Sequence, residues 1–483
     1  MMYDFIIIGA GITGASIARE LSKYKVSVLV LEKENDAANH ATIANSAIVH
    51  AGHDPEPGTL KALLNVEGNQ LYDRLEKELE IPLLRSGAFM VAHDEQEEDT
   101  LKFYYQRAKA NGVTGVELIS GDEARKQEPN LSKSVTLALN LPSTKVTYPW
   151  EVAVASLENA VDNGVVFKRS QEVNLIYKQE GVFTVKTKQE ATFKSRYIIN
   201  AAGAFATRVA GLTEEAPPYK ITPRKGEYMV LDRRVKGFIN RTLYPCPTDK
   251  GKGTLLVPQV HGNILVGPNS VWQDSPDDVT TSKSGLKEIK QGAARLADNI
   301  PFHKTIRTFA GVRATSTHKD FYIKESIEKE NFIHVAGIDS PGISAAPAIG
   351  RYVVEDIIMK KEALVKNSNF NPKRKHIKLF DDMDDDEKKE AFKNDRRYGN
   401  LVCKCERITE ADIVRHIHRS VPVDTVKGIK KRARAGAGLC QGGYCQHTII
   451  HLLAKELNKD VTEVEYYAKG TTIFKEETKV KKR

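Results

Sequence analysis

The apolar positions near the start of the chain form two buried runs separated by a helical pattern. Residues 4–8 contain an unbroken apolar run, which is typical of a parallel strand buried on both faces. Residues 14–23 then have apolar positions at helical spacing, and a second apolar run covers residues 26–31. This order predicts a strand–helix–strand unit of the kind that opens a nucleotide-binding domain.

Further along, the apolar pattern predicts that the chain returns to this first layer several times. A helix is expected over residues 61–80 and another over 103–111. Alternating positions over residues 219–270 indicate an antiparallel sheet. Single strands are expected at 83–93, 136–147, 165–173, 197–203 and 332–337. The pattern therefore predicts a discontinuous nucleotide-binding domain with a β-rich cap inserted in it.

The composition changes to charge runs over residues 360–399, which indicates a solvated connector that is helical in part. Three helices are expected after it: one over residues 409–418 capped by Thr409, one over 424–433, and one beginning near Gln446.

The predicted fold class is α/β, with a small α-helical domain at the C-terminal end. The expected boundaries are 1–80, 150–215 and 305–362 for the nucleotide-binding domain, 81–149 and 216–304 for the cap, 363–397 for the charged linker, and 398–483 for the last domain and its tail.

A glycine-rich fingerprint follows the first strand. Gly9 permits a tight turn, Gly11 lets the backbone approach a pyrophosphate, and Gly14 lets the helix pack closely on the strand. Glu32 ends the second strand, where a carboxylate can accept hydrogen bonds from ribose hydroxyls. A glycine turn that only packs helix on strand is the alternative. The acid and the flanking elements favour dinucleotide binding.

The choice of dinucleotide depends on the rest of the chain. The sequence contains one such fingerprint, so a second domain for NAD(P)H is not expected. The late turn at residues 337–342 precedes an alanine-rich helical stretch, and its amides would reach the far end of a long cofactor. These features favour FAD.

The charge and the N-terminal residues limit where the protein works. The net charge is +9, but 72 Lys and Arg are interspersed with 63 Asp and Glu, which indicates a solvated surface rather than a nucleic-acid stripe. No apolar run approaches the ~18 residues that a membrane span needs, and the first strand leaves no room for a signal peptide. We expect a cytoplasmic protein with at most peripheral association at the inner face of the cell membrane, through the basic residues 479–483.

Four of the five cysteines lie close together near the C-terminal end. Cys403 and Cys405 form a C-x-C pair, and Cys440 and Cys445 form a C-x4-C pair. In a large chain without a signal peptide, such pairs favour metal over disulfides. Four thiolates suit zinc or a [2Fe-2S] cluster, and zinc ribbons usually space their cysteines as C-x2-C. The fifth, Cys246, is expected to be a structural thiol.

Several runs together resemble a known family over roughly residues 1–360. They are similar to the L-2-hydroxyglutarate dehydrogenase and glycerol-3-phosphate oxidase branch of the D-amino-acid-oxidase-like flavoproteins, which have a glutathione-reductase-type FAD-binding domain. The runs are Asn45–Gly52, Pro57–Lys61, Gly226–Tyr228, Val257–Gly262, Phe309–Arg313 and Ser340–Gly342.

The tail from Arg397 to Cys445 resembles the BFD-like [2Fe-2S] domain of anaerobic glycerol-3-phosphate dehydrogenase large subunits. The two resemblances imply non-covalent FAD, a [2Fe-2S] cluster held by the four cysteines, an alcohol substrate that carries an anionic group, and an electron acceptor other than oxygen. Residues 1–360 resemble the oxidase and hydroxyglutarate branch, whereas the tail resembles the anaerobic dehydrogenase subunits. The identity of the substrate therefore stays open.

The resemblance also implies which residues contact the flavin nucleotide. They are expected in the loops that follow the strands of the first layer. The set is Gly9, Gly11, Ile12, Thr13, Gly14, Glu32, Lys33, Thr42, Asn45, Ser46, Val173, Ala202, Gly203, Gly337, Ser340, Pro341, Gly342 and Ile343.

His50 is the expected base, because the resembling enzymes bring this segment close to the isoalloxazine ring. A neutral imidazole suits proton removal near pH 7. A structural histidine, or His53 in its place, is the alternative. Arg313 lies in an apolar strand, where a guanidinium that binds carboxylate or phosphate explains its presence. An internal salt bridge is the alternative for Arg313, and Lys225 is either a second positive charge or a solvated turn residue.

The leading hypothesis is an FAD-dependent dehydrogenase that oxidises sn-glycerol 3-phosphate to dihydroxyacetone phosphate. Hydride would go to flavin N5, and electrons would leave through the [2Fe-2S] cluster to a partner subunit or carrier. The second candidate substrate is L-2-hydroxyglutarate or a related 2-hydroxy acid, and the third is an amino or imino acid. The alternative of another class is a tRNA-modifying flavoprotein with structural zinc. The sequence leaves homo- and hetero-oligomers open and indicates no nucleic-acid partner for the leading hypothesis.

Overall fold

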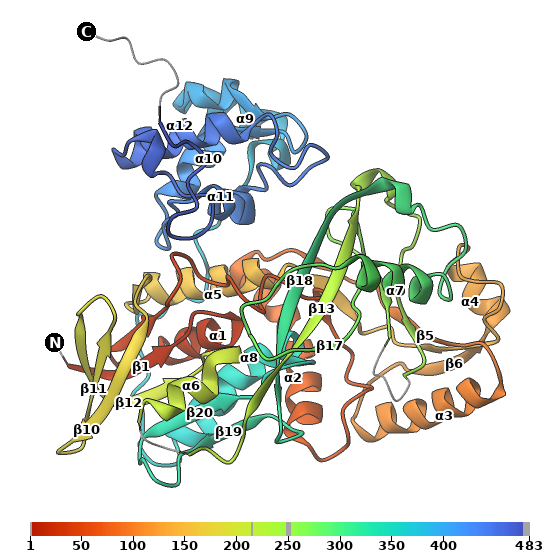
Figure 1. Cartoon of the computed structure of the whole chain (residues 1–483), viewed down its shortest axis with the longest axis horizontal. Helices are drawn as coiled ribbons and strands as arrows, with labels where there is room; N and C mark the ends of the chain where they lie inside the picture. Colours follow the sequence, from red (N-terminus) through yellow and green to blue (C-terminus); the bar gives the residue numbers. More distant parts are fainter. Residues whose placement is uncertain (1, 214–215, 248–252, 477–483) are drawn as a thin grey trace. The chain divides into compact units, whose positions relative to one another are not determined.

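The computed structural model describes residues 2–213, 216–247 and 253–476 (Figure 1). It divides into two compact units. The first contains residues 1–33 and 37–374, and the second contains residues 34–36 and 375–483. The basic tail at residues 479–483 lies outside the described residues. In the part of the chain that is described, no helix is both long and apolar enough to cross a membrane.

The first unit is built on an eight-stranded sheet with a parallel centre. The strands β1 (Met2–Ile8), β2 (Val28–Leu31), β9 (Val166–Lys168), β12 (Thr192–Asn200) and β20 (Phe332–Ala336) run parallel in the order β9-β2-β1-β12-β20. The hairpin β10 (Val173–Gln179) and β11 (Val182–Thr187) extends one side, and β19 (Tyr322–Glu325) pairs antiparallel with β20. All seven residues from Phe5 to Ile8 and from Leu29 to Leu31 are buried, as expected for strands covered on both faces.

Helices cover this sheet and bring distant segments together. The helix α1 (Ile12–Leu21) packs against α5 (Pro149–Asp162) and α8 (Gly342–Tyr352), and α8 also packs against α2 (Leu60–Leu79). The last contact is close, because a Cβ added at Gly68 of α2 would lie 2.0 Å from the carbonyl oxygen of Ser344. Gly68 therefore sets how near the start of α8 comes to α2.

The second sheet has nine strands and two apolar faces. Its order is β17 (Val271–Trp272), β13 (Ile221–Leu231), β16 (Ile264–Gly267), β15 (Leu255–Pro258), β14 (Thr242–Pro245), β5 (Ala88–Ala92), β7 (Leu137–Asn140) and β6 (Glu117–Ser120). The ninth strand, β18 (Thr305–Ser316), pairs antiparallel with β13 along its whole length (Figure 1). Because β18 belongs to this sheet, the sheet extends past residue 304, where the sequence predicted the cap to end.

Successive residues of β13 and β14 face opposite sides of this sheet. Tyr228 and Tyr244 join a core cluster that contains Ala47 and Ile48 of the first layer. Met229 and Leu243 join a different cluster on the other face, which α7 (Lys283–Ala293) covers. One face of the second sheet is therefore turned toward the segment around residues 47–51, and the other is turned away.

The helix α3 (Glu95–Ala110) begins earlier than the sequence predicted. Its first turn is acidic, with Glu95, Glu97 and Glu98, and Asp94 caps it by accepting from the Glu97 amide. The apolar pattern appears only later in the helix, so a periodicity argument missed the first turns. Acidic residues near the N-terminus stabilise a helix through its dipole.

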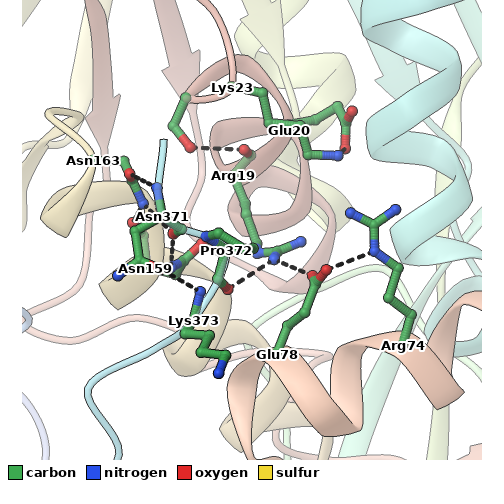
Figure 2. A network of polar contacts seen from close by, with 11 residues as sticks. Arg19, Glu20, Lys23, Arg74, Glu78, Asn159, Asn163, Asn371, Pro372 and Lys373 are labelled. Carbon is green, nitrogen blue, oxygen red and sulfur yellow. Dashed lines mark hydrogen bonds and ion pairs between the residues drawn. The ribbon is translucent and has the colours of Figure 1, made fainter. Parts of the chain in front are cut away.

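The chain after α8 is bound to the first unit up to Arg374, and this corrects the expectation of a solvated linker from residue 363. Arg19 of α1 donates to Asn159 of α5 at 3.0 Å, to Glu78 of α2 at 2.5 Å and to the carbonyl oxygen of Pro372 at 3.2 Å (Figure 2). The side chain of Arg374, only 1% exposed, pairs with Glu151 and Glu158, each at 2.7 Å. Buried charges of both signs hold this segment, which we call the strap (residues 365–374).

The second unit contains seven helices and two hairpin strands among its described residues. They are η5 (Phe380–Asp382), α9 (Asp385–Asn394), η6 (Arg396–Gly399), β21 (Leu401–Cys403), β22 (Ile408–Thr409), α10 (Glu410–Ile417), α11 (Val426–Ala433), α12 (Gln446–Leu457) and η7 (Val461–Glu463). Thr409 accepts from the Asp412 amide and completes a capping box, as the sequence predicted for its cap. Ile413, Ile429 and Leu453 meet in one core with Cys403 and Cys445.

Candidate active site and metal centre

The glycine fingerprint forms the tight turn between β1 and α1. Gly9 has a φ of +108°, and a Cβ there would lie 2.5 Å from the carbonyl oxygen of Ala201. A Cβ on Gly14 would lie 2.0 Å from the carbonyl oxygen of Gly9. The turn thus has no room for side chains at these two positions, and it leaves the backbone bare at the N-terminus of α1, where a pyrophosphate binds.

Glu32 and Thr42 organise this loop. Glu32 is buried at the end of β2 and accepts a hydrogen bond from the Ala10 amide at 2.8 Å through Oε2. A carboxylate has about four acceptor positions, so this bond leaves capacity for ribose hydroxyls. Thr42 Oγ1 accepts from the Ile12 amide at 3.0 Å. A buried acid beside a bare glycine turn fits the adenosine half of FAD.

The other expected FAD contacts lie in loops at the carboxyl ends of parallel strands. Lys33 follows β2, with its Nζ 3.6 Å from the centre of the Phe205 ring. Ala202 and Gly203 follow β12, and residues 337–343 join β20 to α8. The carboxyl ends of parallel strands meet at one edge of a sheet, which is where ligands bind in such folds. The role of each of these residues in FAD binding remains a prediction. The remaining predicted contacts are Thr13 in α1, Asn45 and Ser46, Val173 at the start of β10, Ser340 and Pro341 after β20, and Ile343 in α8.

His50 lies between three elements that fix its backbone and ring. Its amide donates to Ser344 Oγ of α8 at 2.7 Å, and its carbonyl accepts from Asn69 of α2 at 3.1 Å. Its Nδ1 lies 3.1 Å from the hydroxyl of Tyr244 in β14. The histidine is thus oriented by residues from both layers of the first unit.

Tyr244 is a residue that the sequence reasoning missed. Burial raises the pKa of its phenol, which stays neutral and can either donate or accept. His53, the alternative base, is buried with its ring centre 5.5 Å from that of Tyr244. No local motif marks Tyr244, because its partner His50 is 194 positions earlier in the chain.

Arg313 carries a positive charge without an acidic partner among the described residues. Its guanidinium meets two carbonyl oxygens, those of Lys225 at 3.5 Å and Asn269 at 3.4 Å, and these contacts are long. A Cβ on Gly226 would lie 2.6 Å from its Nη2, so the guanidinium rests on that glycine. This arrangement speaks against the internal salt bridge considered as an alternative.

Lys225 is not brought together with Arg313. Their strands pair with Lys225 opposite Val312, and the Nζ of Lys225 binds Asp278 at 2.8 Å. The residue opposite Arg313 is Arg224. The role of Lys225 as a second positive charge remains a prediction, and its side chain pairs with Asp278 rather than facing Arg313.

The four clustered cysteines form two pairs in the second unit. Cys405 Sγ lies 3.8 Å from Cys440 Sγ, and both residues are half-buried. Cys403 and Cys445 are both buried and belong to one core cluster. Two thiolates on one tetrahedral metal at about 2.3 Å lie ~3.8 Å apart. The pair of Cys405 and Cys440 therefore has the spacing of two ligands on one iron.

Backbone amides surround these sulfurs. The pKa of Cys403 falls to about 6 because Cys445 and the amides of Gly436 and Glu406 donate to its sulfur, against the opposing effect of burial. Burial opposes the lowering of the Cys440 pKa as well, and the amides of Tyr444 and Gly442 outweigh it. Amide donors to thiolates are typical of iron–sulfur sites.

Arg432 and Arg434 precede Cys440 in the chain, and the sequence leaves open whether they donate hydrogen bonds to the cluster or are solvated at the surface. Arg434 pairs with Glu406 at 2.8 Å, and Arg432 pairs with Asp36 at 2.8 Å. Asp36 belongs to the short segment 34–36 that groups with the second unit. The expectation that these guanidinium groups donate to the cluster is therefore not supported by their contacts.

The pairwise arrangement bears on the choice of metal. Within the described residues, no group of three or more His, Cys, Asp or Glu side chains is close enough together to hold a single metal ion. A structural zinc needs four converging ligands, whereas a [2Fe-2S] cluster needs two thiolates on each of two irons. The cysteines fit the two-iron cluster better.

Comparisons with known proteins agree with both halves of this site. A family model described as FAD dependent oxidoreductase matches residues 4–356, and one described as BFD-like [2Fe-2S] binding domain matches residues 401–455. A glycerol 3-phosphate dehydrogenase of Caloramator mitchellensis is 41% identical over 99% of both chains. An L-2-hydroxyglutarate dehydrogenase of Escherichia coli is 26% identical over 74% of this chain and 93% of its own.

A solved structure covers the flavin half. The glycerophosphate oxidase of Mycoplasma pneumoniae, solved with FAD bound, has a TM-score of 0.75 and 30% identity over 78% of this chain and all of its own. The similarity covers the whole of that oxidase.

Proposed function

The chain belongs to the DAO family of FAD-dependent oxidoreductases, and we propose that it oxidises sn-glycerol 3-phosphate to dihydroxyacetone phosphate. Its cofactors are FAD and a [2Fe-2S] cluster, as the two matched family models and the FAD-bound relative indicate. The match to a [2Fe-2S]-binding domain disfavours the structural zinc of the tRNA-modifying alternative.

One observation carries the choice of substrate. The 41% identity to a glycerol 3-phosphate dehydrogenase extends over 99% of this chain, so it includes both the flavin half and the cysteine domain. The L-2-hydroxyglutarate dehydrogenase of E. coli is more distant, at 26% over 74% of the chain. That 2-hydroxy acid is the second candidate, and an amino or imino acid is the third.

His50 is the proposed base of the reaction. When bound, FAD supplies the acceptor for the hydride that leaves the carbon of the alcohol. The alcohol must also lose the proton of its hydroxyl, and a neutral imidazole accepts such a proton near pH 7. The His50 ring is held at its Nδ1 by Tyr244, and Nε2 is the atom that we propose to accept the substrate proton.

Tyr244 sets which nitrogen of His50 is basic. A neutral imidazole carries one hydrogen, and the nitrogen without it is the acceptor. If the Nδ1–H donates to the phenol oxygen of Tyr244, Nε2 carries no hydrogen and is the basic nitrogen of the ring. Tyr244 is buried and remains neutral, so it can accept this bond at ordinary pH.

Arg313 is the proposed anchor for the anionic group of the substrate. Its guanidinium has no carboxylate partner among the described residues, and a half-buried charge of this kind is costly without one. A phosphate or carboxylate supplies the missing charge and accepts two parallel hydrogen bonds. The anchor holds the alcohol carbon in one orientation.

The four cysteines are the proposed electron exit. The alcohol releases two electrons, and a [2Fe-2S] cluster held by these cysteines would carry them away one at a time. Cys405 and Cys440 are the more exposed ligands. We infer that a partner subunit or carrier protein accepts the electrons.

Anaerobic mixing with substrate tests the function. Glycerol 3-phosphate should bleach the oxidised flavin absorbance at least tenfold faster than L-2-hydroxyglutarate or glycine, each at the same concentration. Iron analysis and an EPR spectrum of the reduced protein should show a [2Fe-2S] cluster. Bleaching by the hydroxy acid alone would move the assignment to the second candidate, and bleaching by glycine alone would move it to the third.

A further inference from the structure

The two strands that carry Arg313 place a second guanidinium next to it. In the pairing of β13 with β18, Arg224 stands directly opposite Arg313. Residues directly opposite one another in an antiparallel pair have their side chains on the same face of the sheet. Arg224 and Arg313 therefore point to one side, whereas Lys225 points to the other.

That side is the one turned toward His50. Along β13, the side chains of Arg224 and Tyr228 share a face, because they are separated by an even number of positions. Tyr228 stacks on Phe309 of β18 with ring centres 4.8 Å apart, and both lie against the cluster that contains Tyr244. Gly311, between Phe309 and Arg313, approaches Ala44 so closely that a Cβ would lie 1.9 Å from its carbonyl oxygen.

Neither guanidinium is neutralised by a carboxylate of the described residues. The Nε of Arg224 is buried and has no hydrogen-bond partner there. Its charge lies over the ring of Trp272, 5.3 Å from the centre. Burial, and then the charge of Arg313, lower the pKa of Arg224, and Asp339 opposes them only in part. Asp339 itself pairs with Lys61 at 2.8 Å.

Two like charges on one half-buried face cost free energy that the protein alone does not offset. An anion with two negative charges and three acceptor oxygens removes this cost, whereas a monoanionic carboxylate balances only one of the two guanidinium groups. The pair is thus matched in charge and in number of donors to a phosphate monoester in its dianionic form.

We propose that Arg224 and Arg313 bind the substrate anion together, and that Arg224 is the residue that makes the site prefer a phosphate dianion to a carboxylate. This inference rests on the proposed function, because it concerns the same substrate site. It adds a residue that neither the fingerprint nor the family motifs single out. We assign the second positive charge to Arg224 rather than to the neighbouring Lys225, because the Lys225 side chain pairs with Asp278.

The test compares the full-length FAD- and cluster-loaded enzyme with the variants R224Q and R224K. R307Q is the matched control: Arg307 is exposed on β18, six residues from Arg313 and thus ~20 Å along the strand. Binding of inorganic phosphate and of acetate is measured by the change in flavin absorbance, without turnover. Flavin content and thermal unfolding of each variant establish that it is folded.

We expect R224Q to raise the Kd of phosphate and the KM of glycerol 3-phosphate by about tenfold or more, with kcat and the Kd of acetate changing less than threefold. R224K should recover part of the loss, because it restores charge without the fork. Equal effects of R224Q and R307Q, or a fall in kcat at unchanged KM, would overturn the proposal. If glycerol 3-phosphate fails to bleach the wild-type flavin, the proposed function fails, and the phosphate-to-acetate comparison still decides the role of Arg224.

Discussion

The hydroxyl of Tyr244 lies 3.1 Å from Nδ1 of His50, although the two residues are 194 positions apart and belong to different layers of the first unit. The contact joins a strand of the nine-stranded sheet to the segment that follows the dinucleotide-binding unit. It means that the orientation of the proposed base depends on how the second sheet packs on the first layer.

Replacing His50 by glutamine removes the base but keeps a polar side chain. We expect H50Q to slow bleaching of the flavin by glycerol 3-phosphate by about 10²–10⁴-fold, which is the usual contribution of a general base. Anaerobic stopped-flow absorbance measures it, with bound flavin as the check on folding. If H53Q slows bleaching more than H50Q does, His53 is the base.

Replacing Tyr244 by phenylalanine keeps the buried ring and removes the hydroxyl bound to His50. Loss of one hydrogen bond that holds a catalytic ring should lower the rate of flavin reduction about tenfold. The KM for glycerol 3-phosphate should change little, because Arg313 still binds the anion. A raised KM at an unchanged rate would argue that Tyr244 contacts substrate rather than positioning His50.

A methyl group at Gly14 should abolish FAD binding. The added carbon would lie 2.0 Å from the carbonyl oxygen of Gly9, so the turn that approaches the pyrophosphate must open. Purified G14A is expected to contain less than a tenth of the wild-type flavin, measured by absorbance of the released cofactor. Gly211 has open space around it, and G211A should retain full flavin content.

Replacing Cys440 by serine should separate the two electron-transfer steps. We expect C440S to lose iron and the EPR signal of the reduced cluster, because serine replaces one of four thiolate ligands. Flavin bleaching by glycerol 3-phosphate should stay within threefold of wild type. Cys246, whose pKa burial raises to about 12, is the control, and C246S should keep its iron. Iron retained in C440S would exclude Cys440 as a ligand.

The network around the strap should make stability depend on acid pH. Burial alone would raise the pKa of Glu78, but its ion pairs with Arg74 and Arg19 outweigh burial and lower it (Figure 2). A carboxyl whose pKa is lower in the folded state stabilises the fold above its unfolded pKa, and this contribution is lost as pH falls through the folded value.

The variant E78Q should therefore unfold at a lower temperature than wild type at pH 7, by a free energy of about 1–3 kcal/mol. The difference should shrink as pH falls below about 4. Glu76 pairs with the more exposed Arg85, so E76Q should change stability by less than about 1 kcal/mol. A difference between wild type and E78Q that is constant from pH 7 to pH 3 would show that the ion pairs of Glu78 do not cause it.

Local patterns predicted much of the fold. The apolar runs identified β1 and β2, the glycines identified the turn at Gly9, and Thr409 identified the start of α10. Each of these depends on residues within a few positions of one another. The expected ends of the cap at residue 304 and of the FAD-binding domain at residue 362 differ from the structure, and the roles of the individual site residues remain predictions.

The features that the sequence did not predict depend on contacts between distant segments of the chain. Lys225 and Arg224 are neighbours in the chain, and only the pairing of β13 with β18 decides which of them stands beside Arg313. The strap looked like a solvated connector because its residues are polar, yet Arg374 is buried against glutamates more than 200 positions earlier, Glu151 at a separation of 223. Polar composition does not distinguish a solvated segment from a buried network whose charges are paired.

The strap determines where the polypeptide of the first unit can end without losing buried ion pairs. A polypeptide that stopped near residue 362 would remove the buried guanidinium that pairs with Glu151 and Glu158, whereas one that stopped after Arg374 would keep both ion pairs. A flavin-binding half expressed by itself should therefore end after Arg374, because the ten residues of the strap belong to the first unit.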